Sequence, residues 1–171
     1  MSRLVLTVIG EDRAGLVASL ADVVSAHDGN WEHSQMTELA GQFAGVVVVS
    51  VPAEKADALV AALRELDGLM DVAAHPGTEA PQEDAPRQLR IDLLGTDRPG
   101  IVREVSGVLH RHELSIEEMT TGSRDAPMAG GRLFEAHIVV RVGAEADPSV
   151  LRADLEQLAA ELMVDLTVDE E

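Results

Sequence analysis

Residues 95–100 of this chain read Gly-Thr-Asp-Arg-Pro-Gly, and residues 10–15 read Gly-Glu-Asp-Arg-Ala-Gly. The motif Gly-x-Asp-Arg-x-Gly therefore occurs twice, at an offset of 85 residues. Each copy follows an apolar run typical of a β-strand, at residues 4–9 or 89–94, and precedes apolar residues at helical spacing. The motif is thus predicted to connect a strand to a helix in two copies of one structural unit.

A connector of this kind has the features of an anion-binding turn. Glycine permits tight backbone conformations, and the first turn of the following helix has four amide N–H groups without helical partners. These amides and the helix dipole favour a carboxylate. Asp12 and Asp97 add a negative charge beside them, which disfavours phosphate and suits a zwitterion whose ammonium contacts the aspartate. The alternative is that the aspartate caps the helix and the arginine is solvated or paired, and the sequence leaves both interpretations open.

The first half of the chain predicts six elements in the order β-α-β-β-α-β. After the first strand, apolar residues from Leu16 to His27 recur at helical spacing. The mixed stretch at residues 31–39 is interpreted as an edge strand. A strongly apolar strand at 42–51, a helix at 56–66 and a short strand at 70–74 complete the unit.

The second half repeats this order. Ser115 falls where Asn30 lies, and Phe134 matches Phe43 if about six residues are inserted, which we assign to a Gly-rich loop at 122–132. Between the halves, residues 76–87 contain three prolines and three acidic residues. Such a segment cannot build a core, so a stiff linker is predicted there.

Two β-α-β-β-α-β units predict an α+β protein with two ferredoxin-like domains, at residues 1–75 and 88–171. Each domain is expected to form a four-stranded antiparallel sheet with both helices on one face. In this topology the second and fourth strands are the edges of the sheet.

The charge of the chain limits its partners. The net charge is −18 over 171 residues, and both halves are acidic with no basic stripe. We therefore expect no direct nucleic-acid binding, which depends on neutralising phosphates, and no affinity for anionic membrane surfaces. The N-terminal residues do not resemble a signal peptide, and the apolar runs are short of a membrane span. With no cysteine in the sequence, these features fit a cytoplasmic protein.

No set of residues indicates catalysis. His110 and His112 are two residues apart on a predicted helix and face different ways, so they are poor metal ligands. The Gly-rich segments lack the ending of a phosphate-binding loop and the spacing of a dinucleotide fingerprint. We expect no enzymatic activity, no metal and no cofactor.

The repeated motif, the strand order and the duplication together resemble tandem ACT domains, and the architecture resembles the glycine cleavage system transcriptional repressor family. The resemblance implies regulatory domains that bind small ligands, usually amino acids, at the first-helix amides and the start of the second strand. It implies these ligand-binding residues: Asp12, Arg13, Ala14, Gly15, Leu16, Val17 and Asn30 in the first copy, and Asp97, Arg98, Pro99, Gly100, Ile101, Val102 and Ser115 in the second. Ala14 replaces a common proline and Ser115 replaces asparagine, so one of the two sites can be vestigial.

The function implied by the resemblance is that of an amino-acid-sensing regulatory protein. It would be a transcriptional co-regulator of glycine or one-carbon metabolism that acts through a protein partner such as a transcription factor. Glycine and serine are the candidate ligands. The alternative is a stand-alone ACT module that regulates a metabolic enzyme in trans.

The two sheets are expected to differ on the face away from the helices. An apolar sheet face of the size predicted in the first copy is unusual on a soluble monomer. Another sheet, from the second copy or from a second chain, is expected to cover it, and a homodimer is favoured because the charged face of the second copy would be costly to bury. Strand alternation places on this face Val5, Thr7, Ile9, Ala44, Val46, Val48 and Ser50 in the first copy, and Arg90, Asp92, Glu135, His137 and Arg141 in the second.

Overall fold

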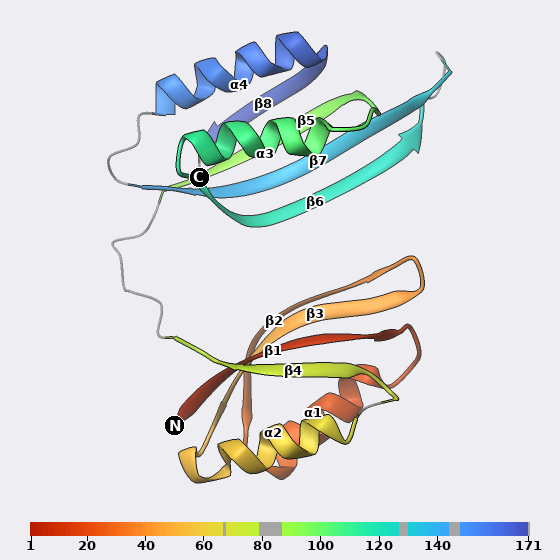
Figure 1. Cartoon of the computed structure of the whole chain (residues 1–171), viewed down its shortest axis with the longest axis vertical. Coiled ribbons are helices and arrows are strands. Elements are labelled where there is room, and N and C mark those ends of the chain that lie inside the picture. Colours follow the sequence, from red (N-terminus) through yellow and green to blue (C-terminus); the bar gives the residue numbers. More distant parts are fainter. Residues whose placement is uncertain (67, 79–86, 127–129, 144–147, 171) are drawn as a thin grey trace. The chain divides into compact units, whose positions relative to one another are not determined.

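The computed structural model describes residues 1–66, 68–78, 87–126, 130–143 and 148–170. The chain forms two compact units, Met1–Pro81 and Gln82–Glu171. Each unit has the predicted order β-α-β-β-α-β, with its two helices on one face of its sheet (Figure 1). Residues 79–86, most of the predicted linker, lie outside the described residues.

The elements of the two units correspond one to one. The elements of unit 1 are β1 (Ser2–Glu11), α1 (Leu16–Ala26), β2 (Asn30–Leu39), β3 (Gln42–Val51), the 3₁₀ turn η1 (Ala53–Lys55), α2 (Ala56–Arg64) and β4 (Asp71–Pro76). The elements of unit 2 are β5 (Arg87–Thr96), α3 (Ile101–Arg111), β6 (Ser115–Asp125), β7 (Arg132–Val142), α4 (Pro148–Leu162) and β8 (Val164–Glu170).

Both sheets are antiparallel and have the predicted edges. Their strand orders are β2-β3-β1-β4 and β6-β7-β5-β8. The strands that lead into the connectors, β1 and β5, are therefore central strands of their sheets. This places both connectors at the end of a strand that is held on both sides.

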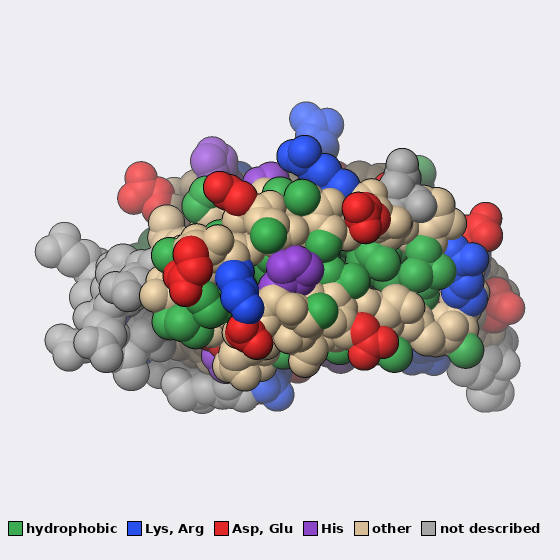
Figure 2. All heavy atoms as spheres, turned by 90° about the horizontal axis from the view of Figure 1, so that it is seen from below, with side chains coloured by type: hydrophobic (Ala, Val, Ile, Leu, Met, Phe, Trp, Pro, Cys, Tyr) green, Lys and Arg blue, Asp and Glu red, His purple; other side chains and the backbone are tan. Residues whose placement is uncertain are grey.

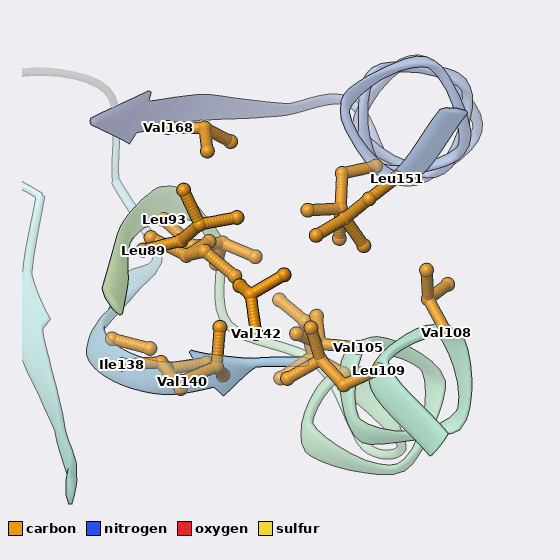
Figure 3. Close-up of a cluster of buried hydrophobic side chains, with 14 of the residues drawn as sticks. Leu89, Leu93, Val105, Val108, Leu109, Ile138, Val140, Val142, Leu151 and Val168 are labelled. Carbon is orange, nitrogen blue, oxygen red and sulfur yellow. The ribbon is translucent and has the colours of Figure 1, made fainter. Parts of the chain in front are cut away.

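The core of each unit follows from strand alternation. In β1, Leu4, Leu6 and Val8 are buried beneath the helices, while the residues between them face the other way. Figure 3 shows the same arrangement in unit 2, where Leu109 of α3 and Leu151 of α4 point toward the sheet. Because Val, Leu and Ile fill these positions, each unit has its own apolar core.

Aromatic residues contribute little to these cores. Trp31, at the start of β2, is partly buried and packs against the core of unit 1, as does Phe43 of β3. Phe134 of β7 is buried in the core of unit 2, at the position that corresponds to Phe43. The sequence contains no other Trp or Phe and no Tyr.

The helix ends also correspond. His27 and His112 are the C-cap residues of α1 and α3. His27 Nδ1 lies 2.8 Å from the carbonyl oxygen of Val23, whereas His112 Nε2 lies 2.8 Å from Oδ2 of Asp154 in α4. The same position thus ends a helix in unit 1 and joins two helices in unit 2.

The Gly-rich loop predicted at residues 122–132 is wrong in extent. β6 continues to Asp125, with Gly122 paired to Glu135 and Arg124 paired to Leu133, and β7 already begins at Arg132. Gly122 is tolerated there because β6 is an edge strand. The space that an added Cβ atom would take is open, since the nearest atom, Glu135 Oε1, is 3.7 Å away. Residues 127–129 lie outside the described residues.

The first glycine of each motif is required by close packing. A Cβ atom on Gly95 would lie 2.2 Å from Cγ1 of Val164, at the start of β8. A Cβ atom on Gly10 would lie 2.9 Å from the carbonyl oxygen of Leu69, just before β4. In both units the last strand therefore starts directly against the backbone of the first strand, where no other side chain fits.

Gly95→Ala should therefore destabilise unit 2. We expect a loss of roughly 1–3 kcal/mol in the free energy of unfolding, as for other overpacked core positions. Gly107→Ala is the matched control, because Gly107 lies inside α3 with no atom of another element within 4 Å of its added Cβ. That variant should gain about 0.5–1 kcal/mol from helix propensity. Urea unfolding followed by circular dichroism measures both, and equal stability of the two variants would contradict the packing argument.

Candidate functional site

The two connectors have the same backbone geometry. Gly15 and Gly100 are the N-cap residues of α1 and α3, each in the left-handed region with φ = 94°. The amide of Asp12 donates to the carbonyl of Gly41 at 2.9 Å, and that of Asp97 donates to the carbonyl of Arg132 at 2.8 Å. The final glycine is needed because other residues rarely adopt this φ, and the backbone bonds fix each connector to the hairpin beside it.

The capping interpretation of the two aspartates is wrong. The N-cap position is a glycine in both units, and neither helix start has a side-chain capping hydrogen bond. The helix-start amides are therefore not used by Asp12 or Asp97, which leaves the first turn suited to an external carboxylate.

The two arginines of the motif have different partners. Arg13 donates through Nη2 to the carbonyls of Gly68 and Leu69, at 3.0 and 2.9 Å. Arg98 instead forms a bidentate pair with Glu104, with Nη1–Oε1 at 3.2 Å and Nη2–Oε2 at 2.5 Å. Arg13 thus ties its connector to the segment before β4, while Arg98 is paired within its own helix start.

Because of the Arg98–Glu104 pair, unit 2 has a carboxylate side chain of its own at the start of α3. Glu104 lies in the first turn of α3. Its Oε1 is 3.7 Å from the position that a Cβ atom added to Gly100 would take. The hydrogen bond from Arg98 holds the pKa of Glu104 below its usual value, so the carboxylate is charged at neutral pH. At the equivalent place α1 has Ser19, and its first turn contains no acidic residue.

The aspartates of the two motifs also differ in their side-chain partners. Asp97 Oδ2 accepts a hydrogen bond from Ser123 Oγ at 3.1 Å and lies 3.9 Å from Nε of Arg132. Asp12 is exposed, and its carboxylate has no side-chain partner among the residues that the structure describes. Unit 1 therefore presents, among the described residues, an aspartate carboxylate without a side-chain partner beside the start of α1, whereas the corresponding aspartate of unit 2 is engaged by Ser123.

A small hollow of about 240 Å³ lies at the unit 1 connector. Its size is below the 300–1,000 Å³ typical of pockets for drug-sized ligands, so it suits a smaller molecule. Five of the predicted residues line it, together with two that the sequence did not indicate, Ala18 and Phe43; the full lining is Asp12, Arg13, Gly15, Leu16, Val17, Ala18 and Phe43. Ala14 lies in the connector but does not line the hollow.

Asn30 and Ser115 lie away from the connectors of their own units. Asn30 pairs with Ser50, which pairs with Arg3 at the start of β1, whereas Gly10 at the other end of β1 pairs with Phe43. Seven strand residues separate these rows, or roughly 23 Å at about 3.3 Å per residue. Ser115 likewise pairs with Arg141 opposite Gln88, near the start of β5. Residues of one unit therefore do not combine the connector and the start of the second strand in one site.

The remaining residues of the unit 2 motif are in the corresponding places. Pro99 is exposed in the connector, Ile101 is buried in the core as the first residue of α3, and Val102 is 42 % exposed. Val17 of α1 is also 42 % exposed. An exposed apolar residue at this position is thus common to both units, and the difference between the sites is electrostatic.

Three further observations concern the surface charge, the helices and the possible metal ligands. Figure 2 shows one face of the molecule, where Lys and Arg side chains are dispersed among Asp and Glu rather than gathered into a stripe. None of the helices within the described residues is long and apolar enough to cross a membrane. In the same part of the chain, no group of three or more His, Asp or Glu side chains could hold a metal ion.

Comparison with known proteins shows the family. Models of the ACT domain match residues 2–75 and 89–160. The chain is 25 % identical to the glycine cleavage system transcriptional repressor of Escherichia coli over 167 residues, which cover 95 % of this chain and 85 % of that protein. A UPF0237 protein of Methanopyrus kandleri is 43 % identical over 65 residues, which cover 38 % of this chain and 70 % of that protein.

A solved structure supports the same conclusion over the whole length. The crystal structure of an unknown protein from Galdieria sulphuraria has a TM-score of 0.86 and 27 % identity, and the match covers 99 % of this chain and 98 % of that one. With matching domain models over both units, this protein belongs to the ACT-domain family and contains two ACT domains in tandem.

Proposed function

We propose that this protein is an amino-acid-sensing transcriptional co-regulator of glycine or one-carbon metabolism, and that its ligand binds at the connector of unit 1. The two ACT domains support a regulatory role in amino-acid sensing. The similarity to a glycine cleavage system transcriptional repressor supports the metabolic assignment.

The unpaired carboxylate of Asp12 is the observation that carries the proposal. A zwitterion in the 240 Å³ hollow would place its carboxylate on the first-turn amides of α1 and its ammonium on Asp12. Arg13 lines the same hollow while bonded to the segment before β4, so its cation adds to the attraction for a carboxylate. The small volume favours glycine or serine over larger amino acids.

Unit 2 is proposed to be the domain that does not bind this ligand. Glu104 already pairs with Arg98 at the start of α3, so this arginine is less available to a ligand carboxylate than Arg13 is in unit 1. Asp97 is engaged by Ser123, which reduces its availability to an ammonium group. The vestigial site is therefore the second copy, although its motif is nearer to the usual pattern.

The regulatory output is proposed to pass through a protein partner such as a transcription factor. The net charge of −18 opposes approach to the phosphate backbone. The scattered basic residues in Figure 2 offer no stripe on that face for DNA.

Replacement of Asp12 should weaken ligand binding. Asp12→Asn keeps the shape of the side chain but removes the charge, so we expect a loss of about 10–100-fold in affinity for glycine or serine, the range for a charge-assisted hydrogen bond. Asp97→Asn is the matched control and should bind like the parent protein. Isothermal titration calorimetry measures both, and unchanged affinity of Asp12→Asn would remove the zwitterion argument.

Ser19→Glu tests the same site from the opposite direction. It gives α1 the first-turn carboxylate that Glu104 gives α3, and we expect it to abolish detectable binding. Ser19→Gln has a similar size without the charge and should bind more tightly than Ser19→Glu. Equal binding by these two variants would show that charge at the helix start is unimportant.

The purified protein alone should have negligible affinity for duplex DNA near physiological salt. The physical reason is its strongly negative charge without a basic patch in the sequence. An electrophoretic mobility shift assay with promoter fragments measures this directly. A sequence-specific shift without any partner protein would contradict the proposed route through a partner.

A further inference from the structure

We propose that β4, an edge strand of the unit 1 sheet, pairs antiparallel with β4 of a second copy of this chain, so that the two sheets become continuous. β4 is the outer strand on one side of its sheet, and it pairs with β1 from Asp71 to Pro76 without a register shift (Figure 1). Such an edge presents backbone N–H and C=O groups that another strand can use. Which strand fits there depends on the direction of these groups and on the side chains beside them.

The backbone groups of β4 alternate between β1 and the open edge. The amide of Gly77, directly after β4, donates to the carbonyl of Arg3 at 2.8 Å, in register with the ladder between β4 and β1. In an antiparallel ladder, residues that bond to one neighbour alternate with residues whose groups point the other way. The odd-numbered residues of β4 therefore bond to β1, whereas the N–H and C=O groups of Val72 and Ala74 point outward.

This edge is accessible to an approaching strand. A hollow of about 610 Å³ borders it, lined by residues of β1, the C-terminal end of α2 and β4. Asp71, Ala73 and His75 are exposed on the side of the sheet away from the helices. Among the residues that the structure describes, the side chains of Asp71 and His75 have no hydrogen-bond or ion-pair partner. Both are therefore available to a second copy.

A two-fold axis at Ala73 is the register that uses the outward groups best. It places Val72 of each copy opposite Ala74 of the other, so that these residues exchange backbone hydrogen bonds. An axis between two residues would place an outward group opposite an inward one. An axis at Ala74 would place Val72 opposite Pro76, which has no N–H to donate.

An axis at Val72 is excluded by a contact of the preceding residue. That axis would place Met70 opposite Ala74 of the second copy. The amide of Met70 already donates to the carbonyl of Leu66 at 3.0 Å, so it is not available to another strand. The backbone of β4 therefore selects the axis at Ala73.

The side chains are complementary in this same register. Asp71 of each copy lies opposite His75 of the other, in a non-hydrogen-bonded pair, where side chains approach most closely. An imidazole N–H can donate to a carboxylate whether the ring is neutral or charged. At the axis, Ala73 meets Ala73 and adds no bulk. The contact is isologous, as a two-fold dimer requires.

The corresponding edge strand of unit 2 has the opposite property. By their register against β5, Asp165 and Asp169 of β8 occupy the positions of Asp71 and His75. Two β8 strands in this register would place carboxylates opposite each other at both ends of the contact, and β4 against β8 would do so at one end. Like charges directly opposite each other destabilise strand pairing. Pairing of β4 with β4 avoids such contacts, so a second copy of unit 1 is the occupant that fits.

The other two edge strands are interrupted. The register of β2 shifts between Trp31 and His33, and that of β6 shifts between Ile116 and Glu118. Bulges of this kind twist an edge and protect it against pairing with another chain. β4 thus combines an uninterrupted ladder with side chains that suit a copy of itself.

His75→Asp should convert the dimer to a monomer in sedimentation velocity. A contact along one strand buries less than the roughly 800 Å² per partner of a standard interface, so we expect the parent dimer at high micromolar concentration. His75→Asp gives β4 the carboxylate that β8 has. Thr167→Asp is the matched control, because it adds the same charge at the exposed edge of unit 2 and should sediment as the parent does.

The double variant Asp71→His with His75→Asp tests the register. It reverses the pair without changing the composition, so the dimer should return. A parent protein that is monomeric at high micromolar concentration, or a double variant that sediments like His75→Asp, would overturn the proposal.

A disulfide at the axis gives a second, independent measurement. The sequence has no cysteine, so Ala73→Cys introduces a single thiol, and the Cα atoms of the two copies would lie about 4.5 Å apart. This distance is within the range of disulfides, so mild oxidation should yield a covalent dimer on a non-reducing gel. Thr167→Cys, the equivalent position of β8, should remain mostly monomeric. Equal yields from the two variants, or no covalent dimer from Ala73→Cys, would refute the pairing.

Discussion

The contact between the first strand and the start of the last strand is the constraint on which each unit depends. At Gly10 and Gly95 the two backbones approach so closely that a Cβ atom would overlap the neighbouring segment. This contact fixes where the first strand ends and therefore where the connector begins. The second glycine of the motif then turns the chain into the helix with φ = 94°. Packing at one glycine and backbone conformation at the other explain why the motif keeps both.

Most of the fold could be predicted from the sequence, because the relevant signals are local and repeated. Apolar alternation predicted the strands and helical spacing predicted the helices, and the agreement of two copies removed ambiguity about their order. The extent of β6 could not be predicted, since Gly122 is read as a turn residue unless its pairing with Glu135 is known. That pairing is a contact between strands, and the local sequence does not contain it.

The position of the two connectors could be predicted from the sequence, but their side-chain partners could not. The connectors were identified from their glycines and aspartates, yet the difference between them depends on distant partners. Arg13 bonds to carbonyls 55 and 56 residues away, and Asp97 is engaged by Ser123 of β6. The distance of Asn30 from the connector of its own unit follows from the topology, because the first helix returns the chain to the start of β1. A residue that directly follows this helix therefore lies at the end of the sheet away from the connector.

The position of Trp31 has an optical consequence. It is the single tryptophan of a chain without tyrosine, and it packs against the core of unit 1. Its emission therefore reports the environment of unit 1 alone, whereas far-ultraviolet circular dichroism averages the backbone of both units. Denaturation curves from the two methods would coincide if the units unfold together and separate if they unfold independently. The chain thus contains an intrinsic reporter that distinguishes one of its two similar domains without a label.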